Sequence, residues 1–144
     1  MRVNKEFEKI RKNLDAKDAI RETIIKNQRD IIKQSKKVIY GIHRNELVAA
    51  KKEASLMQSN LKKLVELTKK HPAMYYSGSI KVAEQEVVEA MALLGVVGDG
   101  ALPTCSSLGV DEENYLLGIC DLFGELSRRA TNAAIKEKYK EAVR

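Results

Sequence analysis

Four acidic side chains stand on two apolar segments of this chain. Glu86 and Glu89 lie three residues apart in "EQEVVEAMALLGVV", and Asp121 and Glu125 lie four apart in "GICDLFGELSRR". Residues three or four apart project from the same side of a helix, so each segment presents a pair of carboxylates. Mg²⁺ and Mn²⁺ take oxygen ligands of this kind, together with waters and phosphate oxygens. The two pairs are therefore candidate ligands for a divalent metal ion.

The surrounding sequence offers these acids no nearby cation. Lys, Arg and His are absent between Lys81 and Arg128, whereas nine Asp and Glu occur there. A buried carboxylate without a partner is costly, so the four acids must reach water, take up protons or meet a cation from elsewhere. The alternative is that they are solvated or ion-paired surface acids. Because the candidate ligands are all carboxylates and no His or Cys cluster accompanies them, zinc is a weaker prediction than Mg²⁺.

Two glycines flank Asp121 within the same segment. Gly118 and Gly124 would each cost about 1 kcal/mol in a helix interior relative to alanine. They predict the close approach of a neighbouring helix or of a substrate backbone, and tight helix packing without chemistry is the alternative.

A basic row with one tyrosine follows the first long helical pattern. Its members recur mostly at steps of three and four, opposite an apolar seam: Arg29, Lys33, Lys36, Lys37, Tyr40 and Arg44. Such a row is either the solvated face of an amphipathic helix or a surface that follows a phosphate backbone, with Tyr40 stacking on a base. His43 either caps the helix or contacts phosphate. A membrane partner is disfavoured, because the apolar face lacks the Trp and Phe of interfacial helices.

The elements that must position these residues are predicted to be helices. The 144 residues fit a single domain, 1–144, and contain only two prolines and no tryptophan, which suits helices better than sheets. Charge is divided along the chain: residues 1–72 hold 19 Lys and Arg against 9 Asp and Glu, a net +10, and residues 73–144 hold 7 against 11, a net −4. The basic half predicts a polyanionic partner such as nucleic acid.

Apolar periodicity predicts an all-α bundle of about five helices. The first runs from about 4 to 43, and the second follows "RNE" with apolar steps of three and four from Leu47 to Leu64. "KKHPAMYYSGS" is a break, and helices at about 79–97 and 112–134 are separated by the loop "GDGALPTCSSLG", with Asp111 as an N-cap. The last segment, "KEKYKEAVR", is predicted to be a short polar helix.

The first helix would be about 60 Å long at 1.5 Å per residue, more than a compact domain of this size covers. Self-association is the economical way to bury its length. No apolar run reaches the roughly 20 residues of a membrane span, and the N-terminus lacks a signal-peptide core, so a cytoplasmic protein is predicted. Cys105 and Cys120 form neither a disulfide framework nor a zinc pattern.

Several ordered blocks resemble the translin superfamily, and closest of all archaeal proteins of the translin-associated factor X type. These blocks are "RDIIKQSKKVIYGIHR", "HPAMYYSGS", "EQEVVEA" and "NYLLGICDLFGEL". The resemblance covers about residues 15–135 and implies an all-helical subunit of a closed, hollow homo-oligomer, a hexamer to octamer. It further implies that single-stranded RNA, or DNA, binds on basic inner surfaces, and that longer relatives continue through further helices past the position of Arg144.

In the catalytic branch of that family, the resemblance implies a Mg²⁺-dependent endoribonuclease whose metal is held by Glu86, Glu89, Asp121 and Glu125. Asp121 is the discriminating residue, because the binding-only branch has an apolar residue there. Arg29, Lys36, Lys37, His43 and Arg44 fall on the family's basic block. Phe123 stands where a small hydroxyl residue is usual, which predicts a narrower or drier site.

The residues leave three functions open. In the first, the four carboxylates hold Mg²⁺ or Mn²⁺ for phosphodiester hydrolysis, Glu125 or Glu89 accepts a proton, and Arg128 stabilises developing charge or pairs with Glu125. The second is a single-strand-binding oligomer without turnover. The third is a helical scaffold.

Overall fold

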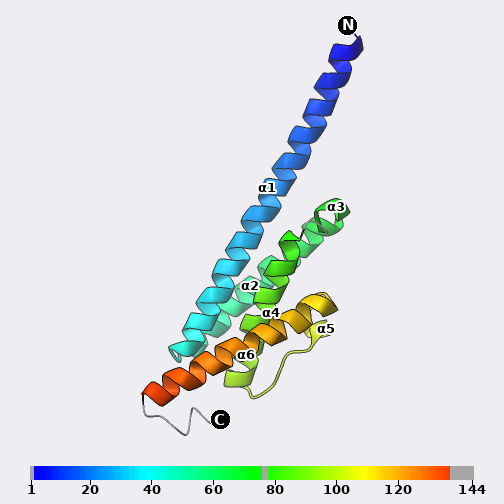
Figure 1. Ribbon diagram of the computed structural model, residues 1–144. Helices are drawn as coiled ribbons and strands as arrows, with labels where there is room; N and C mark the ends of the chain where they lie inside the picture. The colour runs from blue at the N-terminus through cyan, green and yellow to red at the C-terminus, as the bar shows by residue number, and fades with distance from the viewer. Residues whose placement is uncertain (1, 76–77, 137–144) are drawn as a thin grey trace.

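The computed structural model describes residues 2–75 and 78–136, and in that part of the chain it is all-α, as predicted. The helices are α1 (Arg2–His43), α2 (Leu47–Lys69), α3 (Pro72–Tyr75), α4 (Ser79–Gly98), α5 (Cys105–Leu108) and α6 (Glu112–Ile135) (Figure 1). The four long helices fall where periodicity places them, with ends that differ by a few residues at most.

Two helices of four residues were not predicted, because both lie in segments read as a break or a loop. α3 begins at Pro72, whose fixed φ suits the first helical position. α5 begins after Thr104, whose hydroxyl accepts a hydrogen bond from the amide of Ser107. The final polar helix was predicted for 136–144, of which 137–144 lie outside the described residues.

The core forms where α1, α2 and α4 meet. The apolar seam of α1, at Ile24, Ile31, Val38 and Ile42, is fully buried against residues of α2 and α4. α4 lies at the centre of the arrangement, because it packs on α1, on α2 and on α6. Its middle therefore faces helices on several sides, which explains why this segment is apolar nearly all round.

The crossing of α4 and α6 depends on Gly118. A Cβ atom there would lie 2.6 Å from Val88 Cβ and 2.7 Å from the carbonyl oxygen of Gln85, so no larger residue fits without a shift. The predicted close approach of a helix is thus confirmed at Gly118. At Gly124 it is not, because a Cβ atom would meet nothing within 4 Å.

The N-terminal part of α1 extends beyond the other helices (Figure 1). Every residue from 4 to 19 is exposed, and the buried seam begins at Ile24. The expectation that α1 is longer than the domain can cover is therefore confirmed. Within the described residues, no helix has the length and hydropathy needed to traverse a bilayer.

Candidate metal and nucleic-acid site

The four predicted carboxylates come together beside the C-terminal half of α1. Glu86 and Glu89 project from α4, and Asp121 and Glu125 project from α6. Burial and, after it, the charges of the other three carboxylates together raise the pKa of Glu89 to about 7. All four acids therefore lie within electrostatic range of one another. We call them the carboxylate cluster.

Two of the four acids already have partners on α1. The Ser35 hydroxyl lies 2.9 Å from Glu86 Oε2 and 2.8 Å from a backbone carbonyl oxygen of its own helix, so these two acceptors share its one hydrogen. The His43 imidazole Nε2 lies 2.5 Å from Glu125 Oε2, and Arg128 Nη1 lies 3.6 Å from the other oxygen of Glu125. No cation lies near these acids in the sequence, and their partners come in part from α1, which is distant along the chain. Spacing in the sequence could not reveal these contacts.

Glu89 and Asp121 are placed differently. Over residues 2–75 and 78–136, neither makes a hydrogen bond or an ion pair with the protein. Asp121 is exposed and Glu89 is half-buried. Their oxygens are the ones available to a cation or to water.

The cluster is not a closed metal cage. In the described part of the chain, no three Asp, Glu, His or Cys side chains are close enough together to coordinate one ion directly. Mg²⁺, however, usually keeps several waters and takes only one or two carboxylates directly. The possible ligands are all carboxylate oxygens, and their mutual repulsion raises the pKa of Glu89. Such a set fits a Mg²⁺ ion that keeps several of its waters better than one that has lost them.

Part of the basic row borders this cluster. Lys36 lies close enough to Glu89 to lower the pKa of its carboxyl group, against the larger opposing effects. The Arg128 guanidinium stacks over the Tyr40 ring, 5.6 Å from its centroid. Together with His43, these residues place positive and aromatic groups beside the acids.

The other predicted binding residues lie farther along or face other partners. Lys37 lies 3.6 Å from Glu53 on α2, and Arg44 lies 3.0 Å from Glu46. Lys33 is 4.0 Å from Asp30 on its own helix, and Arg29 is exposed one turn earlier. Of these, Arg29 and Lys33 extend the basic row along α1 on the N-terminal side of Lys36.

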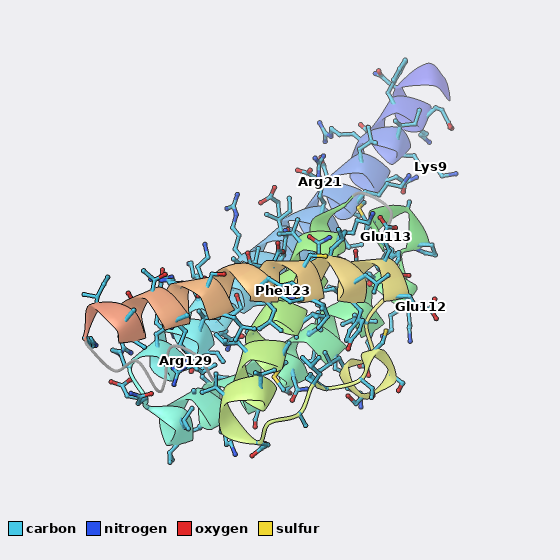
Figure 2. All side chains as sticks on the ribbon, turned by 60° about the horizontal axis from the view of Figure 1, so that its bottom comes forward. Lys9, Arg21, Glu112, Glu113, Phe123 and Arg129 are labelled. Carbon is cyan, nitrogen blue, oxygen red and sulfur yellow. The ribbon has the colours of Figure 1, made fainter. Side chains whose placement is uncertain are left out.

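Two residues that support the site were not predicted. Ser35 sits in the apolar seam of α1, where its hydroxyl is buried and reaches Glu86, and a polar residue in such a seam was the available signal. Arg129 donates to the carbonyl of Ile42 at 3.2 Å and to Asn45 at 3.3 Å, which fixes the end of α1 against α6 (Figure 2). No sequence pattern pointed to this second contact.

Phe123 does not border the carboxylate cluster. It is two residues from both Asp121 and Glu125, which places it on another side of α6, and its side chain is 64% exposed (Figure 2). The expectation that it narrows or dries the site is therefore wrong.

Comparison with solved structures finds chains with a similar arrangement of helices. AfC3PO shares 31% identity with a TM-score of 0.83, covering 95% of this chain and 70% of that one. A structure of AfC3PO with duplex RNA gives 30% identity and a TM-score of 0.81 over the same shares. The structure of apo-NeC3PO gives 28% identity and a TM-score of 0.82, covering 91% of this chain and 69% of that one.

Among curated proteins, the uncharacterized protein MJ0175 of Methanocaldococcus jannaschii is 29% identical over 133 residues. That alignment covers 89% of this chain and 57% of the relative, so the chain spans a little over half of the relative's length. The model of the Translin family matches residues 19–144, which contain the carboxylate cluster and the basic row. This chain belongs to the Translin family.

Proposed function

We propose that this protein is a Mg²⁺-dependent endoribonuclease that cleaves single-stranded RNA. The observation that carries the proposal is the convergence of the two acid pairs of α4 and α6, whose mutual repulsion also raises the pKa of Glu89. A group of carboxylates that repel one another is a site that gains from a divalent cation. Lys36 and Arg128 beside it are suited to a phosphate backbone.

RNA is the favoured polyanion, with DNA as an alternative. One relative of similar fold, AfC3PO, has been solved with duplex RNA, which supports a nucleic-acid ligand for this chain. The net +10 of residues 1–72 supplies the sequence-independent attraction such binding needs. We further propose that the chain works in the cytoplasm as a closed homo-oligomer, a hexamer to octamer, with the carboxylate cluster facing the cavity.

The residues that would hold Mg²⁺ are Glu89 and Asp121 directly, and Glu86 and Glu125 through water. When bound, the ion polarises a phosphoryl oxygen and lowers the pKa of a coordinated water. His43 and Arg128 fix Glu125, and Ser35 fixes Glu86, so these carboxylates are held in place before substrate arrives. Glu89, which has no such partner, is the better placed carboxylate to accept a proton from attacking water.

The basic row then holds and orients the strand. Lys36 lies next to the acids and contacts the phosphate nearest to them, whereas Arg29 and Lys33 follow the backbone farther along α1. Tyr40 is 46% exposed with Arg128 over its ring, an arrangement that leaves area for a base to stack. A strand lying along α1 is thereby brought to the carboxylates.

A non-catalytic strand-binding oligomer is the second candidate. Two observations favour it. Glu86 and Glu125 already have partners within the protein. Among the described residues, no three Asp, Glu, His or Cys side chains are placed to coordinate one ion. This reading predicts steeply salt-dependent binding without turnover.

The test is cleavage of an end-labelled single-stranded RNA by the wild type and by Asp121→Asn, each with Mg²⁺ and with EDTA. Glu112→Gln is a matched control, since it removes one exposed acid from the same helix (Figure 2). We expect cleavage by the wild type and Glu112→Gln with Mg²⁺ alone, and a loss of about 100-fold or more in Asp121→Asn. Equal activity in every arm would remove the proposal, and binding without cleavage would leave the second candidate.

A further inference from the structure

α1 carries one apolar seam that is longer than the domain. Its positions alternate steps of three and four, which is the heptad spacing of a coiled coil. Written out, the seam is Phe7, Ile10, Leu14, Lys17, Arg21, Ile24, Gln28, Ile31, Ser35, Val38 and Ile42. From Ile24 onward this seam is covered by α2 and α4. Before Lys17 it continues in the same register on the part of α1 that extends from the domain.

The outer part of the seam is exposed. Phe7 is 64%, Ile10 44% and Leu14 59% exposed, on a segment whose residues 4–19 are all exposed (Figure 1). The family match begins only at residue 19. This apolar stripe therefore lies before the residues that the family model matches.

We propose that the outer seam, residues 6–14, pairs with the same segment of a second copy of this chain in a parallel two-stranded coiled coil. The charged residues that flank the seam favour an identical helix as the partner and a parallel orientation of the two helices. In the heptad register of Phe7 and Leu14, Glu6 takes the g position and Arg11 the following e position. In a parallel, in-register pair, Glu6 of each copy lies beside Arg11 of the other, which gives two attractive contacts.

The antiparallel registers lack this complementarity. Keeping the apolar seam aligned, they set Arg11 beside Arg11 or Asn4 of the second copy, and Glu6 beside an uncharged residue. A helix that is already formed also avoids the nucleation cost that makes short isolated helices marginal. The seam is thus pre-organised to accept an identical helix.

Lys17 and Arg21 limit the extent of the pairing. Both stand at seam positions, where a parallel partner would bring like charges together. Pairing therefore stops after Leu14, and the two domains stay apart. A contact this short is reversible and adds to whatever interfaces the domain itself makes. It does not depend on the proposed nuclease function, because no residue of the outer seam belongs to the carboxylate cluster.

Cysteine crosslinking tests the direction of pairing in the full-length chain. Cys105 and Cys120 are first replaced by serine, because Cys120 is exposed. Leu14→Cys is then compared with Lys12→Cys, whose position faces away from the seam. We expect a disulfide-linked dimer to form at least about tenfold faster with Leu14→Cys, since equivalent seam positions lie side by side only in a parallel pair. Equal rates for the two variants would overturn the proposal.

A charge exchange tests the same contact without cysteine. Glu6→Lys should raise the dissociation constant of self-association, measured by light scattering over a dilution series, by several-fold, and Arg11→Glu in the same chain should restore it. Ile10→Ser should raise it by about tenfold or more. Circular dichroism is the control that each variant must pass, by retaining the helical signal of the wild type. No change in any of the three variants, or no recovery in the exchanged pair, would contradict pairing through this seam.

Discussion

The imidazole Nε2 of His43 and a carboxylate oxygen of Glu125 lie 2.5 Å apart, although 82 positions separate the two residues in the sequence. Their side chains are only 10% and 18% exposed. The contact joins the end of α1 to the middle of α6 and fixes one member of the carboxylate cluster. Arg128, one turn farther along α6, lies 3.6 Å from the other oxygen.

Removing His43 should therefore weaken both the fold and the site. We expect His43→Ala to lower the free energy of unfolding by about 1–3 kcal/mol, the usual range for a hydrogen bond to a charged group that is shielded from water. Urea denaturation at pH 7 measures this. In a double-mutant cycle with Glu125→Gln, the two effects should not add, since both variants remove one interaction. Strict additivity would mean that the contact contributes nothing to stability.

Glu89 should make the protein less stable as pH rises. Its pKa is about 7 in the folded chain, raised first by burial and then by Glu86, Glu125 and Asp121, against a usual value of 4.5. Between these two values the folded state binds more protons than the unfolded state, so stability falls as pH rises through this window and levels off above about pH 7. Below pH 4.5 the effect vanishes.

Replacing Glu89 by glutamine should remove that slope. We expect Glu89→Gln to match the wild type near pH 4.5 and to exceed it at pH 8 by on the order of 1–2 kcal/mol, after allowance for the solvent screening of a half-buried group. Urea unfolding at both pH values gives the comparison. Glu66→Gln, at an exposed position on α2, controls for the loss of one acid elsewhere. A variant less stable than the wild type at pH 8 would show that the repulsion is relieved in some other way.

Binding of Mg²⁺ should reverse this penalty, because the ion requires the charged form of Glu89. We expect added Mg²⁺ to raise the melting temperature more at pH 8 than at pH 5, and to release protons on binding near pH 7. Calorimetry in two buffers of different ionisation enthalpy measures that release. Asp121→Asn should weaken both effects. A Mg²⁺ effect that is independent of pH would place the ion away from Glu89.

Much of the fold could be predicted from the sequence, because apolar spacing alone placed the four long helices. The four acids could also be assigned to two helices, since spacings of three and four fix a common side. Their partners could not be predicted in this way. Ser35 and His43 reach Glu86 and Glu125 from α1, and that contact depends on how helices cross. The number of Lys, Arg and His residues near an acid in the sequence does not reveal contacts between distant helices.

The two glycines of α6 show the same limit, since they look equivalent in the sequence. At Gly118, a Cβ atom would clash with Val88 and with the backbone of α4, so Gly118→Ala should destabilise the fold by about 1–3 kcal/mol. At Gly124 nothing lies within 4 Å, so Gly124→Ala should stabilise the chain by up to about 1 kcal/mol through helix propensity. Thermal unfolding of the two variants side by side is the measurement. A destabilised Gly124→Ala would indicate that another chain approaches α6 there.

Glu84 shows how a buried acid is satisfied in this fold without a cation. It is 1% exposed and accepts hydrogen bonds from Asn114 Nδ2 at 2.7 Å and from the amide of Asp111 at 3.2 Å, at the start of α6. Burial is the largest influence and raises its pKa, while these two donors act in the opposite direction. The folded state therefore favours the proton, and stability falls as pH rises above the usual value of 4.5.

Asn114→Ala should deepen that pH dependence, because it removes the stronger donor and leaves the charged carboxylate poorly solvated. We expect a loss of about 1–3 kcal/mol in the free energy of unfolding at pH 7, and a smaller loss at pH 4, where Glu84 carries its proton in the folded state. Glu84→Gln combined with Asn114→Ala should show little pH dependence from this position. Urea unfolding at pH 4 and pH 7 tests whether the loss in the free energy of unfolding is larger at pH 7. An equal loss at pH 4 and pH 7 would mean that Asn114 acts by packing at the start of α6 and not through the charge of Glu84.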